Sequence, residues 1–314
     1  MVEKLDHTNG KEQPLVSIIT ACYNSVPFLE RVYNSIKNEG YPNIEWIAVD
    51  DKSPDRTLGK LSELKQRNEI PVKIVALPQN TRAFGAVVAG IDIASGPYTI
   101  ILDHDDELIP GAISKLLATW RRVATPGEKI FSIWGRCINE KDELMGKLYP
   151  QFPVVNTVQY LLHVLKNRSE FFLMLDTDLL RRYYKLKPGE TTKTNGDVWA
   201  EMSQHYKAIF TNDIVRKYYT DIPTSQTNQK KTKIPMAFAL QEANYLNLNY
   251  NVFWQDFVFF FKKIILYQIY SYYAGIGIVA SIKKLNYFTL RLIAVLVLPL
   301  LPFFLLREKL LNKG

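Results

Sequence analysis

Residues 100–107 read IILDHDDE, so an apolar stretch runs directly into four acidic side chains within five positions. Carboxylates this close repel one another unless a cation lies among them. Carboxylate oxygens on a loop suit Mg²⁺ or Mn²⁺, and these ions in turn hold substrate phosphates. The alternative interpretation is a solvated acidic turn that leads into the next helix. The stretch alone does not decide between the two, and the surrounding sequence has to be weighed.

Strand-like and helix-like segments alternate four times around this stretch. Apolar runs predict buried strands, and apolar residues spaced three and four apart predict helices with one buried face. The alternation is typical of a parallel sheet with helices on both faces. Ser53-Pro54-Asp55 predicts the start of the second helix, and Gly96 predicts the end of the third. The expected strands are 15–20, 44–49, 72–77 and 98–102, and the expected helices are 27–38, 53–67, 83–94 and 110–123.

Polar residues follow each of these four predicted strands: Tyr23-Asn24, Asp50-Asp51, Asn80 and 103–106. Right-handed crossovers make the strands point the same way, so these residues should meet at one edge of the sheet. Ligands of open α/β sheets bind at the carboxyl edge. The four clusters together therefore predict a binding site more strongly than the acidic stretch does alone.

Composition limits the class of protein. The chain has 314 residues, is 47% apolar and carries a formal charge of +8, which allows nucleic acid, anionic lipid or phosphorylated substrates as partners. Two cysteines, Cys22 and Cys137, provide neither a disulfide framework nor metal-ligand spacing, which favours a reducing compartment. Residues 1–13 lack an apolar run, so we expect no signal peptide.

The second half is less regular. Expected elements are a strand at 130–137, a turn at 140–143, helices at 158–165, 176–184 and 197–206, and a strand at 171–175; Thr194 or Asn195 should cap the last helix. Residues 220–233 are polar and without periodicity, as in a linker or loop. These changes of pattern divide the chain into a tail (1–14), two halves of an α/β region (15–125 and 126–232) and a helical region (233–314).

The helical region contains two apolar runs. Ile264–Ile282 has 19 uncharged residues, and Leu292–Leu306 has 15, with two prolines inside. A membrane-spanning helix needs about 20 apolar residues. Aromatic residues gather at Trp254–Tyr273, and basic residues border the runs. We therefore expect helices that lie in the membrane interface, with Lys262, Lys263, Lys283, Lys284 and Arg291 at the headgroups. A buried helical hairpin is the alternative.

Four motifs lie between residues 15 and 110: VSIITACYNS (16–25), EWIAVDDKSPDRT (45–57), Asn80 with Ala89-Gly90 and Ala94-Ser95-Gly96, and LDHDDEL (102–108). In their order and spacing they resemble the GT-A-type inverting glycosyltransferases of family 2. The resemblance implies an α/β fold with a Rossmann-like mixed sheet, followed here by a C-terminal membrane-associated helical segment. It also implies a nucleotide-diphospho-sugar donor and Mn²⁺ or Mg²⁺ as cofactor.

The resemblance also assigns roles to single residues. Asp51 would contact the base and Asp103 the ribose side, while Asp105, with Asp106, would hold the metal. Ala21, Tyr23, Asn24 and Asn80 would line the nucleotide sugar. By the same resemblance, residues 15–125 would be the donor half, which binds the nucleotide sugar, and residues 126–232 the acceptor half. In the acceptor half, the best match to the family's acidic motif is NGDVW (195–199), which makes Asp197 the candidate base and Glu190 the substitute. The alternative for Asp197 is an ordinary acid in the first turn of a helix, and for Trp199 it is core packing.

One departure concerns the helix before Gly90, where the family often has Arg-Asn. This chain has Val87 and Val88 there, with Arg82 standing earlier, which puts a phosphate-binding role for this helix in doubt. The membrane-associated region and the resemblance together predict a polyprenyl-diphosphate-linked saccharide as acceptor, the cytoplasmic face of the plasma membrane as location, and no nucleic-acid partner.

Other classes explain the motifs less well. A phosphatase with an Asp-x-Asp motif usually begins with it, whereas here it follows the fourth strand. A P-loop fails because no Lys-Ser/Thr follows Gly90, and no GxGxxG follows the first strand. A non-catalytic membrane scaffold is the remaining alternative, and the intact Asp51, Asp103 and Asp105 argue against it.

Overall fold

A computed structural model describes residues 13–186, 193–220 and 235–311. These residues form two compact units, each with its own hydrophobic core. Unit 1 comprises Met1–Val158, Asn167–Lys185 and Met202–Asp221, and unit 2 comprises Gln159–Lys166, Leu186–Glu201 and Ile222–Gly314. The grouping differs from the division predicted at residues 14, 125 and 232, because the sheet of unit 1 draws strands from both sides of residue 125.

Four parallel strands form the first half of the sheet in unit 1, in the order β3-β2-β1-β4. Their bounds are β1 (Val16–Cys22), β2 (Ile44–Asp50), β3 (Val72–Ala76) and β4 (Tyr98–Ile101). β1 and β2 are almost wholly buried, as expected for strands covered on both faces. The predicted parallel sheet is therefore confirmed.

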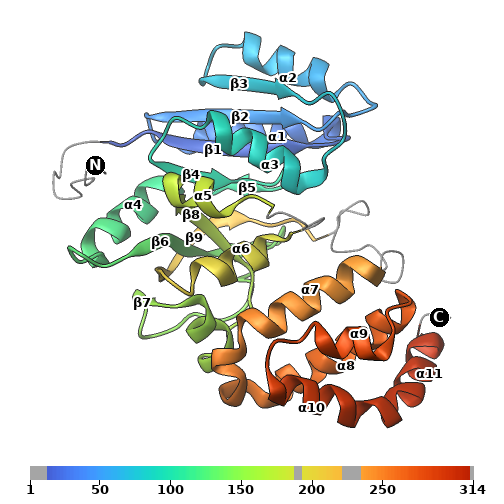
Figure 1. The fold of residues 1–314 in the computed structure, drawn as a ribbon. Coiled ribbons are helices and arrows are strands. Elements are labelled where there is room, and N and C mark those ends of the chain that lie inside the picture. The colour runs from blue at the N-terminus through green and yellow to red at the C-terminus, as the bar shows by residue number, and fades with distance from the viewer. Residues whose placement is uncertain (1–12, 187–192, 221–234, 312–314) are drawn as a thin grey trace. The chain divides into compact units, whose positions relative to one another are not determined.

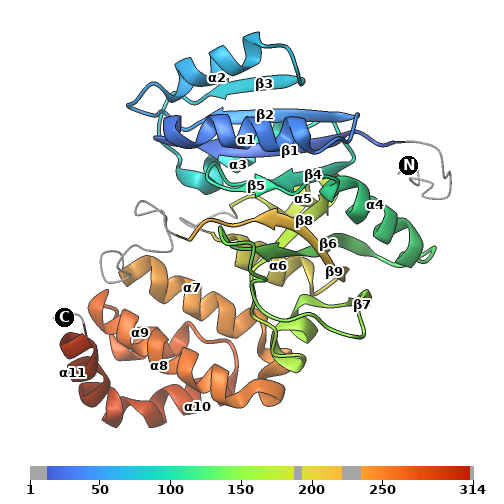
Figure 2. The ribbon, with the colours of Figure 1, turned by 180° about the vertical axis from the view of Figure 1, so that it is seen from behind.

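Helices cover both faces of these strands. Figure 1 shows α3 (Arg82–Ile93) in front of the sheet, and Figure 2 shows α1 (Val26–Asn38) against the opposite face. α2 (Thr57–Gln66) and α4 (Ala112–Val123) pack on the same face of the sheet as α1. The buried apolar residues of these helices form one core with Ile18, Trp46 and Ile100 of the strands. The four helices lie where the periodicity predicts them.

Two predicted helix ends are wrong in detail. α2 begins at Thr57 rather than at Ser53. Asp55 lies ahead of the helix, and its carboxylate accepts hydrogen bonds from the N–H (3.0 Å) and the hydroxyl (2.6 Å) of Thr57, the first helical residue. Gly96 does not end α3 in a left-handed conformation. A side chain there would collide with the carbonyl oxygen of Leu15, so glycine permits close approach of two backbone segments.

The second half of the sheet is mixed. β8 (Phe171–Asp176) pairs antiparallel with both β4 and β6 (Ile130–Ile138), and β9 (Lys207–Lys217) runs parallel to β6. The short strands β5 (Glu107–Leu108) and β7 (Val154–Asn156) pair antiparallel with β9. Helix α5 (Thr177–Tyr183) follows β8. β6, β8 and α5 are predicted from the sequence, and β5, β7 and β9 are not.

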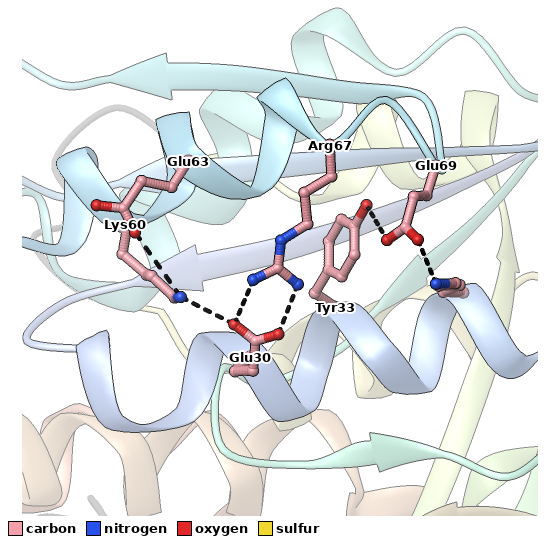
Figure 3. Close-up of polar contacts among 7 residues, drawn as sticks. Glu30, Tyr33, Lys60, Glu63, Arg67 and Glu69 are labelled. Carbon is pink, nitrogen blue, oxygen red and sulfur yellow. Dashed lines mark hydrogen bonds and ion pairs between the residues drawn. The ribbon is translucent and has the colours of Figure 1, made fainter.

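Ion pairs join α1 and α2 on the surface of unit 1 (Figure 3). Glu30 on α1 accepts two hydrogen bonds from Arg67, at 2.6 and 2.9 Å, and lies 2.8 Å from the ammonium of Lys60. Farther along α1, Tyr33 donates a hydrogen bond to Glu69 at 3.1 Å, and Lys37 also pairs with Glu69. The network fixes the helix that follows the first strand.

Unit 2 is helical. Its core is formed by apolar residues of α7 (Pro235–Leu248), η4 (Tyr250–Asp256), α8 (Phe257–Tyr273) and α10 (Phe288–Val297). The remaining helices are η1, a short π-helix (Tyr160–Val164), most of α6 (Asn195–Met202), α9 (Ile278–Lys283), η5 (Leu298–Leu300) and α11 (Leu301–Leu311). The helical character predicted for the C-terminal region is confirmed.

The first of the two apolar runs differs from the prediction. Ile264–Ile282 is not one helix, because α8 ends at Tyr273 and Gly275 takes a left-handed φ of +70°. Much of α8 is buried in the core of unit 2, as the alternative interpretation expects. Lys263 pairs with Glu242 at 2.9 Å instead of lying free for headgroups. In the described residues, the helical segment long and apolar enough to cross a membrane is Phe288–Leu306.

Two expectations fall on residues outside those described. They are most of the linker predicted at 220–233 and the candidate base Glu190.

Candidate active site

The polar residues predicted to meet at the carboxyl edge of the sheet do meet in unit 1. The Asp51 N–H donates to the Cys22 carbonyl at 2.9 Å, which places the end of β2 beside the end of β1. The Asn24 N–H donates to the Ser53 hydroxyl at 3.2 Å. Asn24 has a φ of +53°, a conformation that asparagine adopts more readily than most residues. The loops after β1 and β2 therefore form one continuous rim.

Asp51 organises this rim. Its side chain is 2% exposed, and one carboxylate oxygen accepts hydrogen bonds from the Thr81 N–H (2.6 Å) and hydroxyl (2.9 Å). The Asn80 side-chain amide donates to the Asp51 carbonyl at 3.2 Å. Asp51 thus holds the start of α3, and Thr81 is a contact that sequence reasoning missed. Both bonds to Thr81 use Oδ1 of Asp51.

The ring of Tyr23 is exposed beside this rim, and Ala21 is half-buried at the end of β1. Asn80 is exposed at its side chain. A flat aromatic surface next to a buried carboxylate and two amides can stack against a base and hydrogen-bond its edge. This is the surface on which the predicted nucleotide contacts lie.

The acidic stretch forms the loop between β4 and β5, and its carboxylates point in different directions. The side chain of Asp103 is 62% exposed, while that of Asp105 is half-buried and has no hydrogen bond or ion pair with the residues the structure describes. Asp106 is fully buried, and its Oδ2 lies 3.2 Å from a guanidinium nitrogen of Arg216. Burial raises the pKa of Asp106, and Arg216 opposes that rise.

These side chains fit a divalent ion shared with a substrate. Among the described residues, no group of three or more His, Cys, Asp or Glu side chains converges on a point. Mg²⁺ and its relatives in nucleotide sites use one or two carboxylates and complete their shell with phosphates and water. Asp105 is available for that purpose, and Asp103 is exposed near it, 3.9 Å from a guanidinium nitrogen of Arg216. Asp106 already has a cationic partner, so its predicted metal role meets a competitor in Arg216.

Two arginines at this loop were missed by sequence reasoning. Arg216 comes from β9, a strand the sequence did not predict. Arg31 comes from α1, and its guanidinium donates to the Asp105 carbonyl. Neither lies in a motif near the acidic stretch, so the only signal available in the sequence was their positive charge.

Asp197 belongs to unit 2 and is buried at the start of α6. Its Oδ2 accepts hydrogen bonds from the Thr194 N–H (2.9 Å) and hydroxyl (2.8 Å), and its own N–H donates to the Thr194 hydroxyl at 3.3 Å. These reciprocal bonds form a capping box. Asp197 thus lies in the first turn of a helix, as the alternative interpretation of this residue expects, and it also caps that helix. Burial raises the pKa of Asp197, and the Thr194 bonds oppose the rise.

Solved structures share the fold. The chain aligns with Staphylococcus aureus TarS residues 1–349 over 86% of its own length and 81% of that chain, with a TM-score of 0.60 and 14% identity. The same protein in complex with UDP-GlcNAc gives a TM-score of 0.58, over 90% of this chain and 79% of that one. The mannosyltransferase PcManGT from Pyrobaculum calidifontis, in complex with GDP-Man and Mn²⁺, gives 0.50 at 15% identity, over 97% and 82%.

Curated relatives match about half of the chain. The GalNAc(5)-diNAcBac-PP-undecaprenol beta-1,3-glucosyltransferase of Campylobacter jejuni is 30% identical over 174 residues, 53% of each chain. The Escherichia coli UDP-Glc:alpha-D-GlcNAc-diphosphoundecaprenol beta-1,3-glucosyltransferase WfaP is 30% identical over 144 residues, 45% of this chain and 53% of that protein. The chain therefore spans about half the length of these relatives.

A sequence model of a family matches residues 17–182, more than half of the 314 residues. The matched segment runs from β1 into α5 and contains Asn24, Asp51, Asn80 and the whole acidic loop. The motifs, the mixed sheet and the matched segment agree, and the chain belongs to glycosyl transferase family 2.

Proposed function

We propose that this protein is a metal-dependent inverting glycosyltransferase, which moves a sugar from a nucleotide-diphospho-sugar donor to a saccharide acceptor. The observation that carries the proposal is the carboxyl edge of the sheet. Asn24, Asp51 and Asn80 form one hydrogen-bonded rim there, and the acidic loop at the same edge presents Asp103 and Asp105 outward.

The residues divide the donor between them. The exposed ring of Tyr23 stacks on the base, while Asp51 and the Asn24 and Asn80 amides meet its polar edge, beside Ala21. Asp103 contacts the ribose side, and Asp105 holds the divalent ion. That ion neutralises the charge that builds up on the leaving diphosphate. UDP and GDP-linked sugars in the names of two structural relatives support a nucleotide-diphospho-sugar as the donor class.

Inversion needs a base that removes the proton from the acceptor hydroxyl opposite the leaving group. Asp197 is the candidate, with Glu190 as the substitute. Burial raises the pKa of Asp197, which strengthens it as a proton acceptor near neutral pH. Because the Thr194 bonds use only its Oδ2, Oδ1 is the oxygen that would take the proton.

The acceptor is a polyprenyl-diphosphate-linked saccharide of a bacterial surface glycan. Two relatives that act on undecaprenol-linked saccharides, according to their names, support this choice. An acceptor of this kind stays in the membrane, so the enzyme has to work at the membrane surface.

Unit 2 supplies a surface for that attachment. One face of α10 packs into the core of unit 2 through Leu290, Ala294 and Val297. The positions between them, continued along η5 and α11, leave large apolar side chains exposed at helical spacing: Phe288, Leu292, Val295, Leu296, Leu300, Phe303 and Leu306. Lys283, Lys284 and Arg291 are exposed near this stripe and complement anionic headgroups. The segment thus lies in the cytoplasmic leaflet with its packed face toward unit 2.

Turnover tests the reaction. Purified protein is incubated with Mn²⁺, a lipid-linked saccharide pool and a panel of nucleotide sugars, and release of free nucleotide diphosphate is measured. We expect one donor class to be consumed, and Asp105→Ala to abolish release while the circular dichroism spectrum stays unchanged. Wild-type rates in Asp105→Ala would contradict the proposal.

The base is tested separately. Asp197→Asn should retain donor binding and lose transfer by about 10²-fold or more. Transfer lost in Glu190→Gln but kept in Asp197→Asn would move the role to Glu190. Asp197→Asn keeps the side-chain oxygen that accepts the Thr194 bonds, so α6 should remain capped.

Flotation with anionic liposomes tests the attachment. Leu296→Gln combined with Phe303→Gln should release the protein from the liposomes, because both side chains lie on the exposed stripe. Leu148→Gln removes an exposed leucine from unit 1 and should leave flotation unchanged. Full-length protein that stays out of the liposome fraction would contradict the attachment.

A further inference from the structure

Arg216 is the buried cation of the acidic loop. Its side chain on β9 is 5% exposed, and the guanidinium lies over the rings of Phe172 and Tyr218, at 5.2 and 4.9 Å from their centres. One nitrogen lies 3.2 Å from Asp106, and another donates to Glu170 at 2.6 Å. A buried ion pair persists only where further hydrogen bonds and good geometry offset the loss of water around both charges. Within the described residues Asp106 Oδ2 makes no hydrogen bond, so Arg216 neutralises this carboxylate by charge, while the bond to Glu170 and the two rings hold the guanidinium.

The backbone of the loop is fastened on both sides of Asp103–Asp105. Before it, the Leu102 N–H donates to the Ile19 carbonyl on β1 at 2.9 Å. After it, β5 pairs with β9, with Leu108 opposite Arg216. The Asp106 side chain also accepts a hydrogen bond from the Tyr219 N–H at 3.3 Å. Asp106 thus points into the fold and leaves Asp103 and Asp105 on the outside.

Arg31 holds the outer side of the same loop. Its guanidinium donates to the carbonyl of Asp105 and lies 3.7 Å from the centre of the Tyr219 ring. The Tyr219 hydroxyl donates to Glu107. Arg31 of α1 therefore contacts the loop through its backbone, and Arg216 of β9 contacts it through the Asp106 carboxylate. Neither arginine pairs with the carboxylate of Asp105.

We propose that Arg216 is a positioning residue: it holds Asp106 inside the fold and thereby aims Asp105 at the metal ion and Asp103 at the ribose side of the donor. Asp106 is then an anchor of the loop and not a metal ligand. The inference rests on the proposed metal-dependent function and names the group on which its geometry depends.

Charge repulsion and positioning predict opposite changes in metal affinity when Arg216 is removed, so the direction of the measured change distinguishes the two. A guanidinium nitrogen of Arg216 lies 3.9 Å from a carboxylate oxygen of Asp103 in the same loop as Asp105, so its positive charge repels a divalent ion bound to this loop. If charge were all that mattered, removing Arg216 would tighten metal binding. If Arg216 positions the ligands, removing it weakens metal binding despite the lost repulsion.

The experiment is a Mn²⁺ titration followed by electron paramagnetic resonance, with the full chain, alone and with UDP or GDP present. We expect Arg216→Met to raise the Kd for Mn²⁺ about 10-fold or more, the size of effect seen when partners behind a metal ligand are removed. Arg216→Lys should show a smaller rise, because lysine keeps the charge but not the planar fork. Lys217→Met is the matched control, since Lys217 is next on β9 and pairs with Asp142 instead.

Arg216→Met leaves Asp106 buried without its partner and can fail to fold for that reason alone. Asp106→Asn combined with Arg216→Met removes both charges, and we expect this double variant to fold and still bind Mn²⁺ about 10-fold more weakly. Asp106→Asn alone should keep measurable Mn²⁺ binding under conditions where Asp105→Asn has none.

Two results separate the failures. Wild-type or tighter Mn²⁺ binding in Arg216→Met or in the double variant would overturn the role of Arg216 while the proposed function stands. If the wild-type chain binds no Mn²⁺ with any of these nucleotides, the proposed metal dependence itself is wrong, and the role of Arg216 falls with it.

Discussion

Replacing Glu30 with glutamine tests how much the ion pairs between α1 and α2 stabilise unit 1. Arg67 and Lys60 lower the pKa of Glu30 from 4.5 to about 2. Taken at face value, this difference corresponds to roughly 3 kcal/mol of folding free energy. The side chain of Glu30 is, however, 43% exposed, and water and salt screen such pairs. Because exposed pairs measured by double-mutant cycles contribute about 0.2–1 kcal/mol, we expect Glu30→Gln to lower the free energy of unfolding by about 1 kcal/mol at pH 7.

The pH dependence follows from the direction of the pKa change. The pKa of Glu30 is lower in the folded than in the unfolded chain, so the stabilisation is fully present above pH 4.5 and disappears as the pH falls toward 2. The difference between wild type and Glu30→Gln should therefore shrink over this interval. It should also shrink in 1 M NaCl, where the screening length is about 3 Å.

Urea unfolding followed by circular dichroism measures both effects. Glu63→Gln is the control, because Glu63 lies 3.8 Å from Lys60 and Arg56 and is more exposed than Glu30 (Figure 3). We expect it to change the free energy of unfolding by less than about 0.5 kcal/mol. A loss of roughly 3 kcal/mol in Glu30→Gln that does not respond to salt would refute the argument from solvent screening.

Three further substitutions are informative. Gly90→Ala should lower the free energy of unfolding by about 1–3 kcal/mol, since the added Cβ would lie 2.5 Å from a methyl group on β1. Gly59→Ala, on the open surface of α2, is the control and should be neutral or stabilising. Urea unfolding compares the two variants. Glu39→Gln should lower the free energy of unfolding in urea by about 1–3 kcal/mol, because the carboxylate accepts two backbone N–H bonds of 2.6 Å and an amide nitrogen accepts none. Lys263→Met should cost roughly 3 kcal/mol in thermal unfolding by stranding a buried carboxylate on α7, and Lys262→Met, on the exposed side of α8, should not.

The first half of the fold could be predicted because its signals are local. Each buried strand is an apolar run, each helix has one apolar face, and parallel strands bring their following residues to one edge. Asn24, Asp51 and Asn80 were found together for that reason. The start of α2 could not be predicted, because Ser53 and Asp55 look like cap residues in the sequence. In the fold, Ser53 accepts a hydrogen bond from the Asn24 N–H, and Asp55 binds Thr57 ahead of the helix.

The partners of the acidic loop could not be predicted because their signal is not local. The polar residues Thr211-Asn212-Asp213 interrupt the apolar pattern of β9, and its pairing with β6 contains irregularities. Only the register that puts Leu108 opposite Arg216 shows that this arginine reaches Asp106. The structural role of Asp197 is different, because its signal is local: Thr194 is predicted as a cap and Asp197 as an acid of the first turn, and the structure joins the two in one capping box.

The lengths of the two apolar runs near the C-terminus do not identify the segment that could cross a membrane. Ile264–Ile282 is the longer uncharged run, but Gly275 ends the helix within it, and α8 uses its side chains as core. Of the two prolines in the second run, Pro299 lies in η5 and Pro302 is the second residue of α11. The short 3₁₀ turn η5 joins α10 to α11 without a break. The helical segment that qualifies by length and composition is therefore the second one.

The pairing of β5 with β9 has a consequence for how the protein is made. Glu107 is paired with Lys217, so the loop that carries the acidic side chains closes against residues added 110 positions later. A nascent chain that has emerged only as far as residue 182 contains every residue matched by the family, yet it lacks the strand that holds the loop. Closing so long a loop is slow compared with forming the local βα repeats. The donor half is therefore assembled early in synthesis, while the acidic loop acquires its final shape only after β9 leaves the ribosome.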